Sequence, residues 1–129
     1  MLKSTVVVCL AMFCAALGNV ALSKGMQAIG PLDNYQIMHL IHYFIASVSN
    51  PWVMAGILLE LAYFLLWLAV LSWADVSWAL PMNAVEYLFV AVLAMVWLHE
   101  KIDPSRWVGI GLITLGVLFM MKSWKKETE

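Results

Sequence analysis

Four apolar stretches, each close to the length of a bilayer crossing, constrain this chain more than any other feature. They cover residues 4–23, 52–72, 77–98 and 106–122, and about 20 mostly apolar helical residues cross the hydrocarbon core of a membrane. Only 12% of the residues are charged and 64% are hydrophobic, whereas soluble domains carry about 25% charged residues. The sequence therefore predicts an all-α integral membrane protein, a four-transmembrane-helix bundle forming a single domain over residues 1–129 and lying, multi-pass, in the cell (inner) membrane.

The charges and motifs exclude several other classes of protein. The net charge is −1 and the lysines and arginines are dispersed, so no basic stripe indicates a nucleic-acid partner. The sequence has no glycine-rich phosphate loop, zinc-ligand spacing or serine nucleophile elbow. We therefore expect no catalytic residue, cofactor or metal site, and no enzyme. His39 and His42, three residues apart, could bind a metal, but we favour reading them as amphipathic interface residues.

The first apolar stretch follows Lys3 and has some features of a cleavable signal peptide. Its length is that of a membrane span, and the rest of the chain is equally hydrophobic. We interpret it as a retained helix, with Cys9 and Cys14 as packing residues.

The longest connection, residues 24–51, begins with polar and turn-forming residues around Lys24 and Gly25 and ends at Asn50-Pro51. Between them, apolar residues recur at helical spacing, with polar residues largely on the other side. This pattern predicts an amphipathic helix at about 35–49 that lies in the membrane interface; the alternative is an irregular loop. Tryptophans mark the proposed span ends, as expected for interfacial indoles: Trp52, Trp73, Trp78, Trp97, Trp107 and Trp124.

Two carboxylates, Glu60 and Glu86, fall near the middle of the second and third spans. An ionisable group at that depth costs at least a few kcal/mol and usually faces a cavity or a partner. An aromatic stripe of Tyr63, Phe64 and Trp67 shares the helix face of Glu60, and an acid beside aromatic rings suits a cationic or sugar-bearing ligand. The alternative is that the carboxyl group only hydrogen-bonds a neighbouring helix, with the rings as ordinary packing.

Glu86 lies in a span that contains Pro81, which removes one helical hydrogen bond, and Asn83 precedes the acid on the same face. Transporters shape midplane sites from such interrupted helices, although a tolerated proline bend is the simpler alternative. Asn19 in the first span and Tyr87 beside the acid complete the predicted substrate-binding residues. Gly109, Gly111 and Gly116 in the last span predict a packing or dimerisation face.

Three segments of the second half carry a family resemblance: residues 75–81 (DVSWALP), 99–104 (HEKIDP) and 109–117 (GIGLITLGV). Together they resemble an EamA repeat of the drug/metabolite transporter superfamily. Residues 18–26 (GNVALSKGM) are similar to the first-helix exit of its four-helix members, among them small multidrug resistance proteins and aminoarabinose-lipid flippase subunits. The resemblance implies a dimer, either a homodimer or a paralogous heterodimer, with the ligand between the subunits.

One departure bears on the mechanism. Small multidrug resistance exporters rely on a glutamate in the first helix, whereas this first span contains no acid.

The main hypothesis is an EamA-like transporter that moves a small metabolite, an organic cation or a lipid-linked sugar across the lipid bilayer. The rival is a non-transporting scaffold or an accessory subunit of a flippase or transporter complex.

Overall fold

A computed structural model describes residues 2–127, with side chains from Lys3 to Ser123. The described residues form six helices: α1 (Leu2–Ile29), α2 (Ile37–Ser49), α3 (Pro51–Leu71), α4 (Val76–Met82), α5 (Val85–Trp97) and α6 (Pro104–Glu127). Within residues 2–127, four segments are long and apolar enough to cross a membrane, and α4 and α5 together make one of them. The predicted all-α membrane bundle with four spans and a shorter helix is confirmed.

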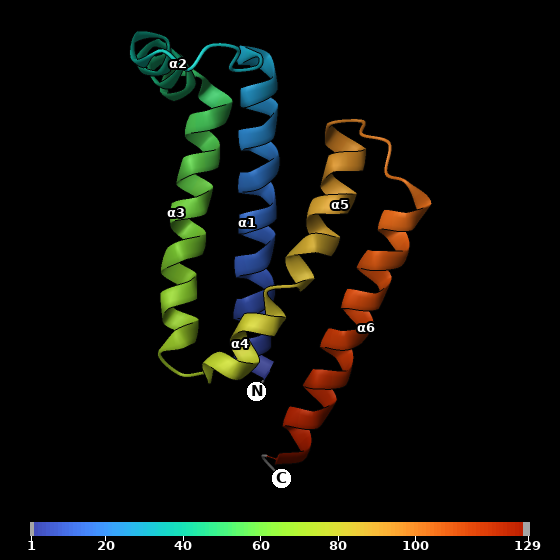
Figure 1. The fold of residues 1–129 in the computed structure, drawn as a ribbon. Helices are drawn as coiled ribbons and strands as arrows, with labels where there is room; N and C mark the ends of the chain where they lie inside the picture. Colours follow the sequence, from blue (N-terminus) through green and yellow to red (C-terminus); the bar gives the residue numbers. More distant parts are fainter. Residues whose placement is uncertain (1, 128–129) are drawn as a thin grey trace.

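Helices α1 and α3 lie side by side and antiparallel (Figure 1), and glycines let their backbones approach closely. A Cβ atom added to Gly56 of α3 would lie 2.6 Å from Leu22 Cγ and 3.0 Å from the carbonyl oxygen of Gly18. One added to Gly25 would lie 2.5 Å from a methyl carbon of Val53. Small residues permit such approach between membrane helices, where van der Waals packing drives association.

This close pairing explains why α1 is longer than predicted. Residues 24 and 25 were expected to start a connecting segment, but the helix continues through them to Ile29. Glycine disfavours a helix interior by about 1 kcal/mol, yet Gly25 is buried against α3. The helix ends instead at Gly30, whose φ of 94° is easy for glycine, followed by Pro31.

Helix α2 confirms the predicted amphipathic helix and excludes the irregular-loop alternative. It lies across the end of the α1–α3 pair (Figure 1). The Tyr43 hydroxyl donates a hydrogen bond of 2.9 Å to the Gly30 carbonyl, which ties α2 to the end of α1. The large apolar side chains are exposed: Ile37, Met38, Leu40, Ile41, Phe44, Ile45 and Val48. An exposed apolar face on a helix beside the spans fits a location in the membrane interface.

The third span is broken in two. Helix α4 ends at Met82 and α5 begins at Val85, with Asn83 and Ala84 between them. Pro81 lies in the last turn of α4, where its ring removes a helical donor. Helix α4 is held by the core at the end of the bundle near the start of α1, and this core comprises Val8, Ala11, Met12, Val70, Trp78, Ala79, Met82 and Val117.

Tryptophans lie near the helix ends as predicted, but they are not all at the surface. Trp78 is only 3% exposed and belongs to the core, whereas Trp73 is exposed. The side chain of Trp124 lies outside the described residues.

Helix α6 lies at the edge of the bundle, beside α5 and away from the α1–α3 pair (Figure 1). Only 6% of its most apolar window is buried, against 44% for α1. Most of its perimeter is therefore free to contact lipid or another chain.

Candidate functional site

Three spans meet around a polar pair formed by Asn19 of α1 and Glu86 of α5. The Asn19 amide donates a hydrogen bond of 2.8 Å to Glu86 Oε1. Both residues lie within spanning segments. The bond places the carboxyl group of the third span against the first span, which itself has no acid.

Glu60 of α3 lies on the other side of the same stretch of α1. Its Oε1 would be 2.8 Å from a Cβ atom added to Gly18, so the missing side chain at position 18 makes room for the carboxyl group. This Oε1 atom is buried and has no hydrogen-bond partner within the described part of the chain. Glu60 and Glu86 thus approach adjacent residues of α1, Gly18 and Asn19.

Tyr63 and Asn83 add further polar groups near these acids, and they connect α3 to the break in the third span. The Tyr63 hydroxyl and the Asn83 side-chain amide lie 3.3 Å apart in a partly buried hydrogen bond. The rings of Tyr63 and Trp67 stack with their centroids 6.2 Å apart and their planes at 29°. Tyr63 and Trp67 of the aromatic stripe on the face of Glu60 therefore stack on each other, whereas Phe64 of the same stripe is exposed.

The break itself places Glu86 in the first turn of α5. Negative charge is favoured at a helix N-terminus by the macrodipole. The backbone N–H of Glu86 bonds the Asn83 carbonyl at 3.0 Å, so the acid is fixed directly to the interrupted segment. An acid at an interrupted helix near mid-membrane is the arrangement from which transporters build binding sites.

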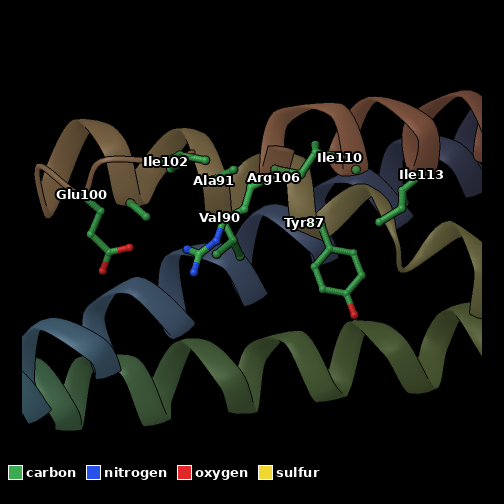
Figure 2. Close-up of a pocket in the computed structure, with 10 residues that line it drawn as sticks. Tyr87, Val90, Ala91, Glu100, Ile102, Arg106, Ile110 and Ile113 are labelled. Atoms are coloured by element: carbon green, nitrogen blue, oxygen red, sulfur yellow. The ribbon is translucent and has the colours of Figure 1, made fainter. Parts of the chain in front are cut away.

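Six of the seven predicted substrate-binding residues thus gather in one cluster, and the seventh does not. We call this group the polar cluster: Asn19, Glu60, Tyr63, Trp67, Asn83 and Glu86. Tyr87 lies on a different side of α5, where it is 60% exposed and lines a groove between α5 and α6 (Figure 2).

The three glycines predicted as a packing face have no packing role within the described chain. A Cβ atom added to Gly109, Gly111 or Gly116 would meet nothing within 4 Å. Gly109 lines the α5–α6 groove. A role for these glycines between two chains stays a prediction.

The remaining candidates show no clustered chemistry. Cys9 and Cys14 are free thiols of intermediate burial. His39 and His42 are exposed on α2, and the described residues include no group of three or more potential metal ligands.

The sequence did not predict one contact, in which the Lys24 side chain lies against two tryptophan rings. Lys24 Nζ lies 4.1 Å from the ring centroid of Trp52 and 5.7 Å from that of Trp97, and these two indoles meet edge to face at 5.8 Å. The signal available in the sequence was the enrichment of tryptophan near span ends, but the contact of residues 24, 52 and 97 requires the three-dimensional pairing of α1, α3 and α5.

Comparison with known sequences settles the family. The sequence model of the EamA-like transporter family matches residues 2–122, nearly the whole chain. This chain belongs to the EamA-like transporter family. The resemblance drawn from residues 75–81, 99–104 and 109–117 is thereby confirmed, and with four spans the EamA-like chain is a multi-pass membrane protein.

Curated relatives of this EamA-like chain carry the name "Probable 4-amino-4-deoxy-L-arabinose-phosphoundecaprenol flippase subunit ArnE". The protein of Aeromonas hydrophila is 31% identical over 74 residues, which cover 57% of this chain and 65% of the relative. That of Pectobacterium atrosepticum is 35% identical over 73 residues, with the same coverage. The matched segments thus span less than two thirds of these relatives. No solved structure matches the chain.

Proposed function

We propose that this chain is a transporting subunit that moves an amine-bearing lipid-linked sugar, or a related small metabolite or organic cation, across the bilayer. The observation that carries the proposal is the pair of carboxyl groups, Glu60 and Glu86, on either side of Gly18-Asn19 within the membrane. Acids at that depth are costly and usually serve a substrate or ion pathway. Two neighbouring acids favour a ligand with positive charge.

The surroundings of the acids support a sugar or amphipathic ligand. Tyr63 and Trp67 offer a stacked aromatic wall, and Asn19 and Asn83 offer amide hydrogen bonds. The family membership and the flippase names of the relatives point to the same class of ligand. Transport, rather than an enzymatic reaction, is the activity that this combination supports.

The transporting unit in this proposal is a dimer, of two copies or of this chain with a paralogue. The low burial of α6 leaves a spanning helix available for a second chain. The word "subunit" in the names of the relatives is in keeping with an assembly of chains.

The test uses purified chain in lipid vesicles that contain 4-amino-4-deoxy-L-arabinose-phosphoundecaprenol in the inner leaflet. A membrane-impermeant amine reagent reports the amount that reaches the outer leaflet. We expect the native chain to move the lipid and Glu60→Gln or Glu86→Gln to slow it at least tenfold. Asp33→Asn, an exposed acid outside the spans, is the matched control. Equal rates in all variants would remove the acids from the proposed site.

A second candidate is a scaffold or accessory subunit, which two observations favour. The bonds between Asn19 and Glu86 and between Tyr63 and Asn83 each join two different helices, as polar residues do when they hold membrane helices together. In that case Glu86→Gln, which can still accept a hydrogen bond from Asn19, would leave assembly intact, whereas Glu86→Leu would disrupt it. The isolated chain would move no lipid, whether native or variant.

A further inference from the structure

The groove between α5 and α6 is apolar over most of its length and has charged residues toward one end. Its volume is about 340 Å³, at the small end of the ~300–1,000 Å³ range of ligand pockets. Its wall is mainly apolar, and it is lined by Val90, Ala91, Ala94, Ile102, Ile110 and Ile113. Glu100 and Arg106 also line it, and they lie toward one end while Tyr87 lies toward the other (Figure 2).

Small residues create the hollow. Ala91 and Ala94 on α5 are opposed by Gly109 on α6, and a side chain at Gly109 would meet no atom within 4 Å. The apolar wall lies between two spanning segments, so we expect it to face hydrocarbon rather than water. The volume accommodates a stretch of one lipid chain and not a whole lipid.

The charged end of the groove is where the two spans are connected, and there we expect a lipid headgroup. Glu100 is in the α5–α6 connection, and Arg106 is in the first turn of α6. Figure 2 shows both side chains projecting to the same side of the helices as Tyr87. Neither side chain is bound in an ion pair or hydrogen bond within residues 3–123, so both are available to a ligand.

These two groups select the headgroup. A guanidinium binds phosphate through a planar fork of donors, and Arg106 lies at a helix N-terminus, where the macrodipole adds to the attraction for an anion. The Glu100 carboxylate beside it would repel a headgroup that carries phosphate alone, but it complements an amine. A headgroup with both charges satisfies both residues.

We propose that the α5–α6 groove is a lipid-entry site: Arg106 holds the phosphate of an amine-bearing lipid, Glu100 faces its amine, and the apolar wall holds the first part of its hydrocarbon chain. This inference rests on the proposed function for the identity of the ligand. Tyr87 lies about 10 Å further along α5 than Ala94, given the helical rise, and next in sequence to Glu86. The groove thus extends from the membrane surface to the depth of the polar cluster.

The experiment measures lipid binding rather than transport. The full chain is reconstituted in phosphatidylcholine nanodiscs with 4-amino-4-deoxy-L-arabinose-phosphoundecaprenol or with undecaprenyl phosphate, and the bound lipid is counted by native mass spectrometry. We expect the amine-bearing lipid to bind at least tenfold more tightly than undecaprenyl phosphate. Arg106→Gln should weaken binding of both lipids about tenfold, since bonds to charged groups contribute about 1.5–3 kcal/mol. Glu100→Gln should abolish the preference between them.

Two glycines provide a matched pair for the apolar wall. Gly109→Leu fills the groove, whereas Gly111→Leu adds the same side chain two residues further along α6, at a position that does not line it. We expect only Gly109→Leu to weaken lipid binding. Equal binding by both variants, or unchanged binding in Arg106→Gln, would overturn the entry site.

The two proposals fail in different ways. If Glu60→Gln and Glu86→Gln stop transport while Arg106→Gln binds lipid normally, the entry site is wrong and the transport function stands. If the native chain moves no lipid but the Gly109 and Arg106 variants lose binding, the groove is a lipid site and the transport function is wrong. Free inorganic phosphate that competes with the lipid at millimolar concentration would identify an anion site without lipid specificity and would also overturn the proposal.

Discussion

The side-chain amide of Asn19 in the first span donates a 2.8 Å hydrogen bond to the carboxyl group of Glu86 in the third. This bond crosses between helices far apart in the sequence, and it gives the half-buried acid a partner on a span that has no acid of its own. The hydrogen bond thus brings together two residues that belong to different spans of the sequence.

Loss of the Asn19 amide should weaken the bundle. Asn19→Ala leaves Glu86 without its donor, and hydrogen bonds between membrane helices contribute about 0.6 kcal/mol on average and up to about 1.7. We expect the free energy of unfolding to fall by about 1 kcal/mol, measured by steric trapping in bicelles. Thr114→Ala is the control, because the Thr114 hydroxyl bonds only the Ile110 carbonyl of its own helix. A larger loss in the control would contradict the importance assigned to the contact between helices.

The glycines of the α1–α3 contact should differ from those of α6. In Gly56→Ala the new methyl group meets Leu22 Cγ at 2.6 Å and the Gly18 carbonyl oxygen at 3.0 Å, so the backbones must separate. Overpacking costs about 1–3 kcal/mol, which we expect as a loss of stability in thermal unfolding. Gly111→Ala meets nothing within 4 Å and should be neutral or slightly stabilising, because alanine favours a helix by up to about 1 kcal/mol over glycine. Similar losses in both would show that the close approach of α1 and α3 is not what position 56 requires.

Gly18→Ala should separate stability from activity. Its methyl group would lie 2.8 Å from Glu60 Oε1, at the end of a flexible side chain that can move aside. We therefore expect a smaller loss of stability than in Gly56→Ala, together with slower transport because the carboxyl group is displaced. Thermal unfolding of Gly18→Ala and Gly56→Ala compares the two losses of stability, and the vesicle assay measures transport. Transport at the native rate in Gly18→Ala would count against a substrate role for Glu60.

Lys24 should stabilise the end of the bundle through Trp52. An ammonium group over an indole contributes about 0.5–2 kcal/mol, depending on desolvation, and Lys24 Nζ lies 4.1 Å from the ring centroid. Lys24→Gln should lower the free energy of unfolding within that range, and Lys24→Arg, which keeps the charge, should lose less. The exposed Lys101 provides the control variant Lys101→Gln. An unchanged stability in Lys24→Gln would mean that the contact contributes nothing.

Pro81 should influence transport through the break in the third span. Pro81→Ala restores a backbone donor that can reach the Ser77 carbonyl and so favours a continuous helix. We expect slower transport without loss of folding, measured in vesicles and by circular dichroism. Pro104→Ala is the control, since Pro104 occupies the first position of α6, where proline is well tolerated. Transport at the native rate in Pro81→Ala would mean that the break does not require its proline.

The parts that the sequence predicts well depend on local patterns. Span lengths and the amphipathic periodicity of residues 35–49 predict which segments are helical, because hydrophobicity and helix geometry determine both. The shared face of Glu60, Tyr63 and Trp67 follows from their spacing, and this is why these residues gather in the structure.

The parts that the sequence does not predict depend on tertiary contacts. Gly25 continues a helix because α3 packs against it, and its intrinsic propensity gives the opposite prediction. Tyr87 faces the α5–α6 groove rather than the polar cluster, because consecutive side chains of a helix point about 100° apart, and only the packing of α5 shows that Glu86 is the one facing α1. The contact of Lys24 with Trp52 joins two helices whose pairing no local pattern reveals.

The exposed position of α6 has an evolutionary consequence. Because the last span shares so little buried surface with the other three, substitutions along most of its length leave the packing of the bundle undisturbed. Such substitutions can change the choice of partner chain or lipid without loss of folding, whereas substitutions in α1 and α3 meet closely packed neighbours. New specificities in such a protein would arise at its edge sooner than at its centre.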